Sequence, residues 1–313
     1  MLEKLAPLWG EWYPEEVLGE GAFGRVWRVK NGSGIHGAVK ELVIPLSEEM
    51  LRAAWIHGLT PDGARQYYRA LAEDARREID RMDKLRGCPN IVRVHERLVR
   101  ELTGEEGAGW LVLMRMDCLT PFRELWLGGE MTVDRVAKLG IEIARALEAC
   151  AEQGIVHRDV KPDNLFYDRE NDRFQLGDFG IARELAEPTQ GMMGAGTLTH
   201  LPPEVFYGGP YTCGADLYAL GMIVYHLLNH NRLPLLPDFP ESFTPAQRDE
   251  AVARRLAGAE IELPSRARGA AGTLAGRLGA IARRAITPEP ERRFRDAKHF
   301  RCAIEDAVGG ADT

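Results

Sequence analysis

Two polar motifs constrain this chain more than any other feature: the segment 157–164, which reads His-Arg-Asp-Val-Lys-Pro-Asp-Asn, and the tripeptide Asp178-Phe179-Gly180. Between them, residues 165–167 and 173–176 read as two short strands, because each run is rich in apolar and aromatic residues. The polar stretch 168–172 that separates them is typical of a turn. The sequence therefore predicts two paired strands with a polar motif on either side.

Together these motifs resemble the catalytic loop and the metal-binding loop of protein kinases, H-R-D-x-x-x-x-N and D-F-G. The resemblance implies that Asp159 accepts the proton of the attacking hydroxyl and that Lys161 neutralises the transferred phosphate. It also implies that Asn164 and Asp178 bind the metal ions that bridge the nucleotide phosphates. One such tripeptide arises readily by chance, but the ordered set in this strand context does not.

Residues 19–26, Gly-Glu-Gly-Ala-Phe-Gly-Arg-Val, form a glycine-rich segment ahead of a predicted strand. Glycines let the backbone approach phosphates closely and adopt positive φ. Dinucleotide-binding folds carry a similar pattern, but there the third glycine opens a helix. Here residues 25–30 alternate like a strand and residues 31–34 are typical of a turn. The glycines are therefore predicted to lie in a hairpin.

This hairpin resembles the phosphate-covering loop of protein kinases, and Ala38-Val39-Lys40 resembles the strand motif that follows it. The resemblance implies that Lys40 binds the nucleotide phosphates and pairs with a Glu on the next helix, for which Glu78 is the candidate. The predicted nucleotide-contacting residues are Gly19, Glu20, Gly21, Ala22, Phe23, Gly24, Val26, Ala38, Lys40, Met116, Asp117, Cys118, Leu119 and Phe166.

Glu78 lies on a segment where Ile79, Met82 and Leu85 recur at helical spacing. The segment from Lys40 to Glu78 is longer than a minimal kinase needs. Within it, residues 47–68 contain the helix-start signal Thr-Pro-Asp at 60–62 and predict two extra helical pieces leading into this helix. The hypothesis is that the insert braces the helix; a tolerated surface elaboration is the alternative.

Residues 92–95 and 110–113 are predicted to form two further strands. The second continues toward the hinge, the segment that the kinase resemblance implies between the two lobes. An acidic residue often follows the gatekeeper in that family. Met116 followed by Asp117 fits this pattern, which makes residues 117–119 the hinge that binds adenine through backbone groups. A register with Leu113 as gatekeeper is the alternative.

The second half of the chain carries further kinase-like patterns. Thr132 begins an amphipathic helix that ends at Gly154. The segment 196–204, Gly-Thr-Leu-Thr-His-Leu-Pro-Pro-Glu, resembles the end of a kinase activation segment, with His200 and Pro202 as departures. The resemblance implies that Thr197 contacts Asp159 and Lys161.

The same resemblance predicts a buried ion pair between Glu204 and Arg293, and an anchor for the catalytic loop in Asp216. Thr189 is the first candidate for regulatory phosphorylation and Thr199 the second. An acidic mimic at Glu184 or Glu187, or no such control, is the alternative.

Composition excludes several classes of protein. The net charge of −7 argues against a nucleic-acid-binding chain. The five cysteines form no C-x-x-C pair, which favours reduced thiols and a cytoplasmic location. No signal peptide or lipidation motif is evident. The most apolar stretch, 217–228, is too short to span a bilayer and is predicted to be a buried helix.

The predicted fold is therefore an α+β, two-lobed protein kinase fold over about residues 13–308, with an antiparallel sheet plus helix C in the N-lobe and a mainly helical C-lobe. The predicted lobes are 1–116 and 120–313, joined by the hinge 117–119. The predicted reaction is transfer of the ATP γ-phosphoryl group to Ser or Thr hydroxyls of proteins. Mg²⁺ is the expected metal, with Mn²⁺ as an alternative.

A resemblance to stand-alone bacterial Ser/Thr kinases favours autophosphorylation, with a homodimer as one route to it. No nucleic acid or membrane insertion is expected. The rival functions are a pseudokinase scaffold, disfavoured because Lys40, Asp159, Asn164 and Asp178 are all present, and a small-molecule kinase, disfavoured by the glycine hairpin and the segment 196–204.

Overall fold

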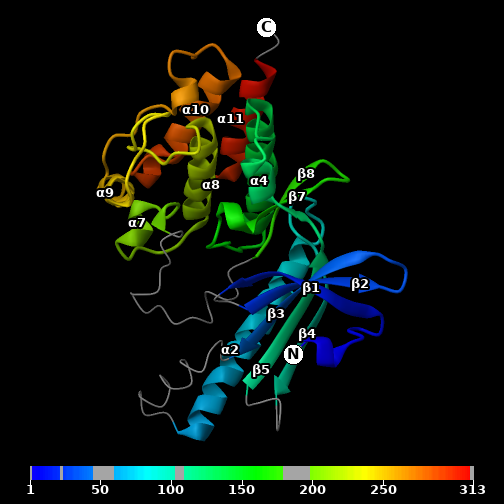
Figure 1. Cartoon of the computed structure of the whole chain (residues 1–313). Helices are drawn as coiled ribbons and strands as arrows, with labels where there is room; N and C mark the ends of the chain where they lie inside the picture. Colours follow the sequence, from blue (N-terminus) through cyan, green and yellow to red (C-terminus); the bar gives the residue numbers. More distant parts are fainter. Residues whose placement is uncertain (1, 22–23, 45–59, 103–108, 179–197, 311–313) are drawn as a thin grey trace. The chain divides into compact units, whose positions relative to one another are not determined.

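The computed structural model describes residues 2–21, 24–44, 60–102, 109–178 and 198–310, with some side chains of 61–82 left undescribed. The described residues divide into two compact units. The first comprises residues up to Gly87 and from Val92 to Leu119; the second comprises Cys88–Ile91 and the residues from Thr120 onward. Figure 1 shows the elements of each unit.

The first unit is built on a five-stranded antiparallel sheet with the strand order β1-β2-β3-β5-β4. Its strands are β1 (Trp12–Gly21), β2 (Gly24–Asn31), β3 (His36–Ile44), β4 (Val94–Leu102) and β5 (Gly109–Asp117). The pairing of β1 with β2, down to Gly21 opposite Gly24, confirms the predicted glycine hairpin. The strand predicted at 92–95 begins two residues later, at Val94, and both β4 and β5 continue further than predicted, because residues that include charged side chains extend their pairing.

Side chains alternate between the two faces of this sheet. One face is covered by the N-terminal segment, in which the 3-10 helix η1 (Leu2–Leu5) leads to Leu8 and Trp12. These residues form a core with Trp27, Val29, Val39, Leu111 and Leu113 from the strands. The guanidinium of Arg115 lies 4.2 Å from the ring centroid of Trp12 and extends this packing to the end of β5.

The helix α2 (Pro61–Met82) contacts β3, β4 and β5. It begins at the predicted start signal, where the hydroxyl of Thr60 accepts a hydrogen bond from the Gly63 amide. The short 3-10 helix η2 (Asp83–Leu85) follows it. One prediction was wrong: residues 61–68 are not a separate piece but the first turns of the same helix that carries Glu78, because nothing breaks the helix between them. Residues 47–59 lie outside the described part.

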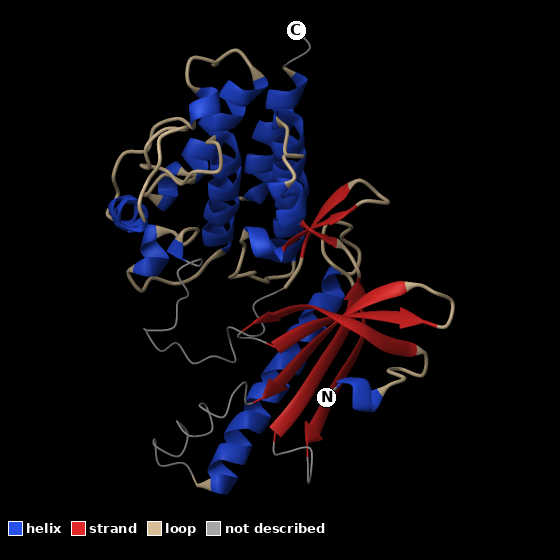
Figure 2. Cartoon of the chain, in the orientation of Figure 1, coloured by secondary structure: helices blue, strands red, loops and turns tan. Residues whose placement is uncertain are grey.

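The second unit consists mainly of helices, as Figure 2 shows. Its helices are α3 (Phe122–Leu127), α4 (Val133–Glu152), α7 (Pro203–Phe206), α8 (Cys213–Leu228), α9 (Pro245–Leu256), α10 (Leu274–Ala285) and α11 (Ala297–Gly309). Among them α4, α8, α10 and α11 pack together. Gly221 brings α8 close to α10, because a Cβ there would lie 2.5 Å from that of Ala285. The hydroxyl of Thr132 caps α4 as predicted, and α8 is the predicted buried helix.

A small sheet of β6 (Thr120–Pro121), β7 (Leu165–Asp168) and β8 (Arg173–Leu176) completes the second unit, in the order β6-β7-β8. Its strands β7 and β8 confirm the two short strands predicted between the polar motifs. The amide of Asn90 donates to the Phe174 carbonyl at 3.0 Å and fastens residues 88–91 to this sheet. The remaining short turns are η4 (Pro162–Asn164), η5 (Ser265–Ala267) and η6 (Pro290–Arg292).

Together the antiparallel sheet and the helical region confirm the predicted α+β class. All five cysteines carry free thiols, as their spacing predicted. Over the residues that the structure describes, every helix is too short or too polar to cross a bilayer.

Candidate active site

The segment 157–164 folds so that three of the predicted catalytic side chains meet. The ammonium of Lys161 lies 2.7 Å from Oδ2 of Asp159. The amide Nδ2 of Asn164 donates to the same oxygen at 2.9 Å and to the Asp159 carbonyl at 2.7 Å. The carboxylate of Asp159 is therefore held at one oxygen by two donors, which fixes its rotamer and leaves its orientation set before any substrate arrives.

The backbone of this loop is anchored by Asp216, a buried residue in the first turn of α8. Its two carboxylate oxygens accept hydrogen bonds from the amides of His157 at 2.7 Å and Arg158 at 2.9 Å. Arg158 has a φ of 67°, a left-handed conformation that a non-glycine residue adopts only when its surroundings enforce it. Burial raises the pKa of Asp216 to about 7, although the two amides act in the opposite direction. The predicted anchoring role of Asp216 is confirmed at the level of contacts.

His157 fastens the loop to the residues that follow β8. It is fully buried, and its Nε2 lies 3.1 Å from the Gly177 carbonyl. Burial lowers the pKa of His157 to about 4, so the ring is neutral at pH 7. The Gly177 amide in turn donates to the Asn164 carbonyl at 2.9 Å. These contacts bring Asp178, which has a φ of 57°, next to the loop that carries Asp159.

The oxygen ligands that the resemblance predicts for a metal suit Mg²⁺. Both hydrogens of the Asn164 amide are directed to Asp159, so its oxygen remains to act as a ligand. An amide oxygen and the carboxylate of Asp178, with phosphate oxygens and water, form the hard oxygen set that Mg²⁺ prefers. Among the described residues there is no cluster of three or more His, Cys, Asp or Glu side chains that would hold a metal without a nucleotide.

In the first unit, four of the predicted nucleotide-contacting residues share one face of the sheet. Lys40 pairs with Val26 on one side, and Ala38 pairs with Met116 on the other. Paired residues of an antiparallel sheet point to the same side, and residues two apart on a strand do so as well. Val26, Ala38, Lys40 and Met116 therefore project from the face opposite the N-terminal segment.

The pairing also distinguishes the gatekeeper candidates. Leu113 is opposite Glu41 and packs in the core with the N-terminal segment, so it faces away from Lys40. Met116 lies on the same face as Lys40, as does the buried Met114, which pairs with Lys40 directly. Sequence reasoning passed over Met114, although its separation of two from Met116 places both on one face of a strand.

Gly24 is required where it stands in the hairpin. Its φ is 108°, and a Cβ at this position would lie 2.0 Å from the carbonyl oxygen of Glu41. Gly19 has no atom within 4 Å of the position a Cβ would take. Glu20 is exposed and forms an ion pair with Arg25 at 2.9 Å, and Gly21 ends β1. Ala22 and Phe23 lie outside the described residues.

The predicted hinge residues 117–119 all belong to the first unit. Asp117 ends β5, and its carboxylate lies 2.6 Å from Nε2 of His95 on β4. Cys118 and Leu119 follow as half-buried residues of the first unit. Phe166 lies on β7 of the second unit, where it pairs with Pro121. The side chain of Glu78, and the whole of Thr197, Thr189, Glu184 and Glu187, lie outside the described part of the chain.

The end of the segment 196–204 is held by two buried arginines that stack on one tyrosine. Arg293 forms a bidentate ion pair with Glu204 at 2.7 and 2.8 Å, as predicted. Arg255, on α9, is 1% exposed and donates to the carbonyls of Leu198 at 2.7 Å and Leu201 at 2.9 Å. Both guanidiniums lie over the ring of Tyr218, at 4.6 and 5.7 Å from its centroid. Nothing in the spacing of Arg255 distinguished it from the surface arginines around it, so sequence reasoning missed it.

A comparison of the sequence with models of known protein families agrees with this geometry. The model described as the protein kinase domain matches residues 12–242, which is more than half of the chain. This chain belongs to the protein kinase family. The family resemblance predicted from the polar motifs is thereby confirmed.

Relatives of this kinase-family chain include bacterial serine/threonine-protein kinases. It is 30% identical to PknJ of Mycobacterium tuberculosis over 307 residues, covering 96% of this chain and 46% of the relative. It is 31% identical to PknD of the same species over 226 residues, covering 70% and 31%. It is 32% identical to Pkn1 of Myxococcus xanthus over 190 residues, covering 58% and 25%. The chain thus spans less than half the length of these relatives.

Proposed function

We propose that this chain is a Ser/Thr protein kinase that uses ATP with Mg²⁺. The observation that carries the proposal is the arrangement around Asp159, whose carboxylate is held by Lys161 and Asn164 on a loop fixed by Asp216. The names of the bacterial relatives support the Ser/Thr specificity. The presence of Lys161 two residues after Asp159 supports it as well.

In the proposed reaction, the hydroxyl oxygen of the substrate forms a bond to the γ-phosphorus while the bond from that phosphorus to the bridging oxygen of ADP breaks. Asp159 orients the hydroxyl and accepts its proton, and Lys161 neutralises charge on the transferred phosphoryl group. Magnesium bound at Asn164 and Asp178 would supply charge neutralisation at the phosphates. Catalysis in this scheme rests on positioning and electrostatics.

The proposed nucleotide-binding surface comprises the face of the sheet that carries Val26, Ala38 and Lys40, with Gly19–Gly24 above the phosphates. Lys40 binds phosphate oxygens and pairs with Glu78 of α2. For the gatekeeper we retain Met116 and add Met114, because both lie on the face of Lys40. The backbone of residues 117–119 is proposed to bind adenine, and Phe166 is a further proposed nucleotide contact. Residues 1–116 and 120–313 are the corresponding proposed lobes.

Phosphorylation of the chain by a second copy of itself, at Thr189 or Thr199, is the proposed form of control, and Thr197 is proposed to contact Asp159 and Lys161. The proposed site of action is the cytoplasm. A scaffold that binds nucleotide without turnover is the second candidate, since the contacts around Asp159 would be compatible with binding alone.

The experiment that separates these functions is a phosphoryl-transfer assay with labelled ATP, Mg²⁺ and a generic protein substrate. Wild-type protein is compared with Asp159→Asn, which keeps the shape of the side chain but removes the base. We expect transfer to fall by about 10²- to 10⁴-fold, with ATP affinity and melting temperature unchanged. Equal ATP binding by both proteins with no transfer by either would establish the scaffold instead.

A further inference from the structure

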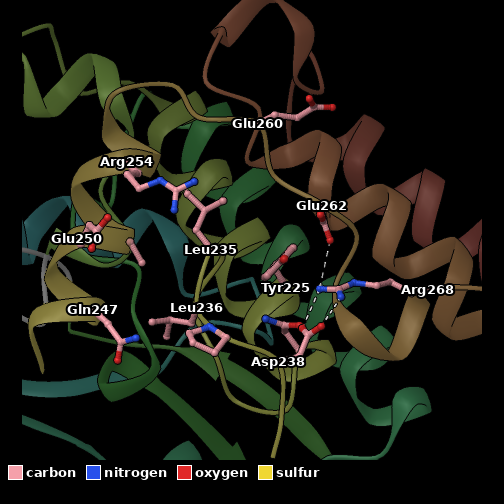
Figure 3. A pocket seen from close by; sticks show the side chains of 13 residues that line it. Tyr225, Leu235, Leu236, Asp238, Gln247, Glu250, Arg254, Glu260, Glu262 and Arg268 are labelled. Carbon is pink, nitrogen blue, oxygen red and sulfur yellow. Dashed lines mark hydrogen bonds and ion pairs between the residues drawn. The ribbon is translucent and has the colours of Figure 1, made fainter. Parts of the chain in front are cut away.

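A pocket of about 570 Å³ lies in the second unit, and none of its lining residues has a role in the proposed reaction. It is formed by the end of α8, the loop 235–238, the helix α9 and the segment 260–268, as Figure 3 shows. Its volume lies in the range of pockets that bind small ligands or single side chains of a partner.

The charges that line the pocket favour a cation. Six ionisable side chains belong to residues that line it: Asp238, Glu250, Glu260, Glu262, Arg254 and Arg268. Four carboxylates thus oppose two guanidiniums. Arg268 is already engaged, since it binds Asp238 through two contacts at 2.6 and 3.0 Å and lies 3.6 Å from Glu262. Arg254 is the other cation of the lining, so the four carboxylates leave a net negative charge.

Tyr225 points to a ligand independently of these charges. The residue lies on α8 and is 2% exposed, yet it lines the pocket and makes no hydrogen bond with the described residues. Figure 3 shows its ring between Leu235 and the ion pair of Arg268 with Asp238. Buried hydroxyl groups are normally hydrogen-bonded, so a partner for this hydroxyl is expected inside the pocket.

Two exposed aromatic residues lie in the segment that follows the pocket-lining loop 235–238. Phe239, which follows Asp238 directly, is 60% exposed, and Phe243 is 38% exposed. Both rings gather around the guanidinium of Arg232, at 5.6 and 5.3 Å from its central carbon. Exposed aromatic residues beside a pocket are typical of protein interaction surfaces.

We propose that this pocket binds an arginine or lysine side chain from a basic segment of a protein partner, with Phe239 and Phe243 packing against apolar residues of the same segment. The cation would lie between Glu250 and Glu260, and the Tyr225 hydroxyl would bind a polar atom of the bound segment. The proposal does not rest on the kinase activity, because the binding requires no nucleotide.

The probe is the blocked heptapeptide Gly-Phe-Arg-Gly-Arg-Phe-Gly, which has no hydroxyl to phosphorylate. Its affinity for the whole chain is measured by calorimetry at low ionic strength and without nucleotide, beside the same peptide with citrulline in place of each arginine. We expect the arginine peptide to bind at least about fivefold more tightly, and the difference to shrink as salt is added.

Three variants locate the binding. The double variant Glu250→Gln with Glu260→Gln should weaken binding by about fivefold or more, and Tyr225→Phe, which preserves packing, by about threefold. The matched control is Asp249→Asn, a neighbour on α9 that does not line the pocket and should bind as wild type. Melting temperatures verify that each variant is folded.

The proposal requires that both pocket variants lose affinity for the arginine peptide while the Asp249→Asn control keeps wild-type affinity. It is overturned if citrulline and arginine peptides bind equally, if no peptide binds, or if either pocket variant retains wild-type affinity. It is also overturned if a glutamate version of the peptide binds more tightly, which would make Arg254 the centre of an anion site. A wild-type dimer that dissociates in the pocket variants would identify a second copy of the chain as the occupant.

Discussion

The two units position their predicted functional residues in different ways. In the second unit, the loop 157–164 is fixed by buried polar groups, in which Asp216 binds two amides and Asn164 binds Asp159. In the first unit, Val26, Ala38 and Lys40 share a face because strands alternate, and apolar packing on the other face keeps the sheet in register. Catalytic geometry in the second unit should therefore depend on single hydrogen bonds, and that of the first unit on backbone pairing.

The largest expected effect comes from removing the buried anchor. Asp216→Ala leaves the amides of His157 and Arg158 without an acceptor, which should cost about 2 to 6 kcal/mol in the free energy of unfolding and abolish phosphoryl transfer. Asp216→Asn retains one acceptor oxygen and should lose less. Urea denaturation measures both. A stability loss below about 1 kcal/mol for the alanine variant would contradict the claim that single buried hydrogen bonds fix the loop of the second unit.

The next effect is a dependence of stability on pH. His157 has a pKa of about 4 in the folded chain, below its ordinary value of 6.5, so its contribution is present above pH 6.5 and is lost as the pH falls through about 4. That loss amounts to about 3 kcal/mol. The contribution of Asp216, whose pKa is raised to about 7, has the opposite sign and is lost as the pH rises through about 7.

The two contributions are separated by denaturation at pH 7 and pH 5. Relative to wild type, Asp216→Asn should lose more stability on acidification, because only the histidine contribution remains. His157→Asn should gain stability on acidification, because only the contribution of Asp216 remains. Identical pH dependence in all three proteins would contradict the account of a loop fixed by buried polar groups.

Two glycine substitutions test whether backbone pairing determines the geometry of the first unit. Gly24→Ala places a Cβ 2.0 Å from the Glu41 carbonyl at a φ of 108°, and should lower the free energy of unfolding by about 2 kcal/mol and weaken ATP binding. Gly19→Ala meets no atom within 4 Å and should stay within about 0.5 kcal/mol of wild type. Thermal melts and nucleotide titration compare them. Equal losses in the two variants would mean that backbone pairing at Gly24 is not the constraint.

The smallest predicted effect concerns Arg255. Arg255→Met removes the donors to the Leu198 and Leu201 carbonyls, and should raise the KM for a peptide substrate by about tenfold while the KM for ATP stays unchanged. Tyr218→Phe keeps the ring and removes one acceptor of Arg255, so its effect should be smaller. A parallel rise of both KM values would indicate general loss of structure rather than positioning of this segment.

Sequence reasoning succeeded where a motif and its contacts are local. The strand pair β7–β8, the glycine hairpin of β1 with β2 and the cap at Thr132 are each specified within a few residues, and each formed as predicted. It failed where contacts with elements distant in the sequence determine the structure. The length of α2 depends on how a continuous helix packs on β3–β5, and the role of Arg255 depends on the carbonyls of Leu198 and Leu201, more than fifty residues away.

The measurement that tests the central claim most directly is phosphosite mapping by mass spectrometry after incubation with ATP and Mg²⁺, for wild type and Asp159→Asn side by side. The account predicts phosphothreonine or phosphoserine in the wild type, at Thr189 or Thr199 first, and none in the variant, with equal ATP affinity in both. Phosphate incorporation that persists in Asp159→Asn would contradict the assignment of Asp159 as the base.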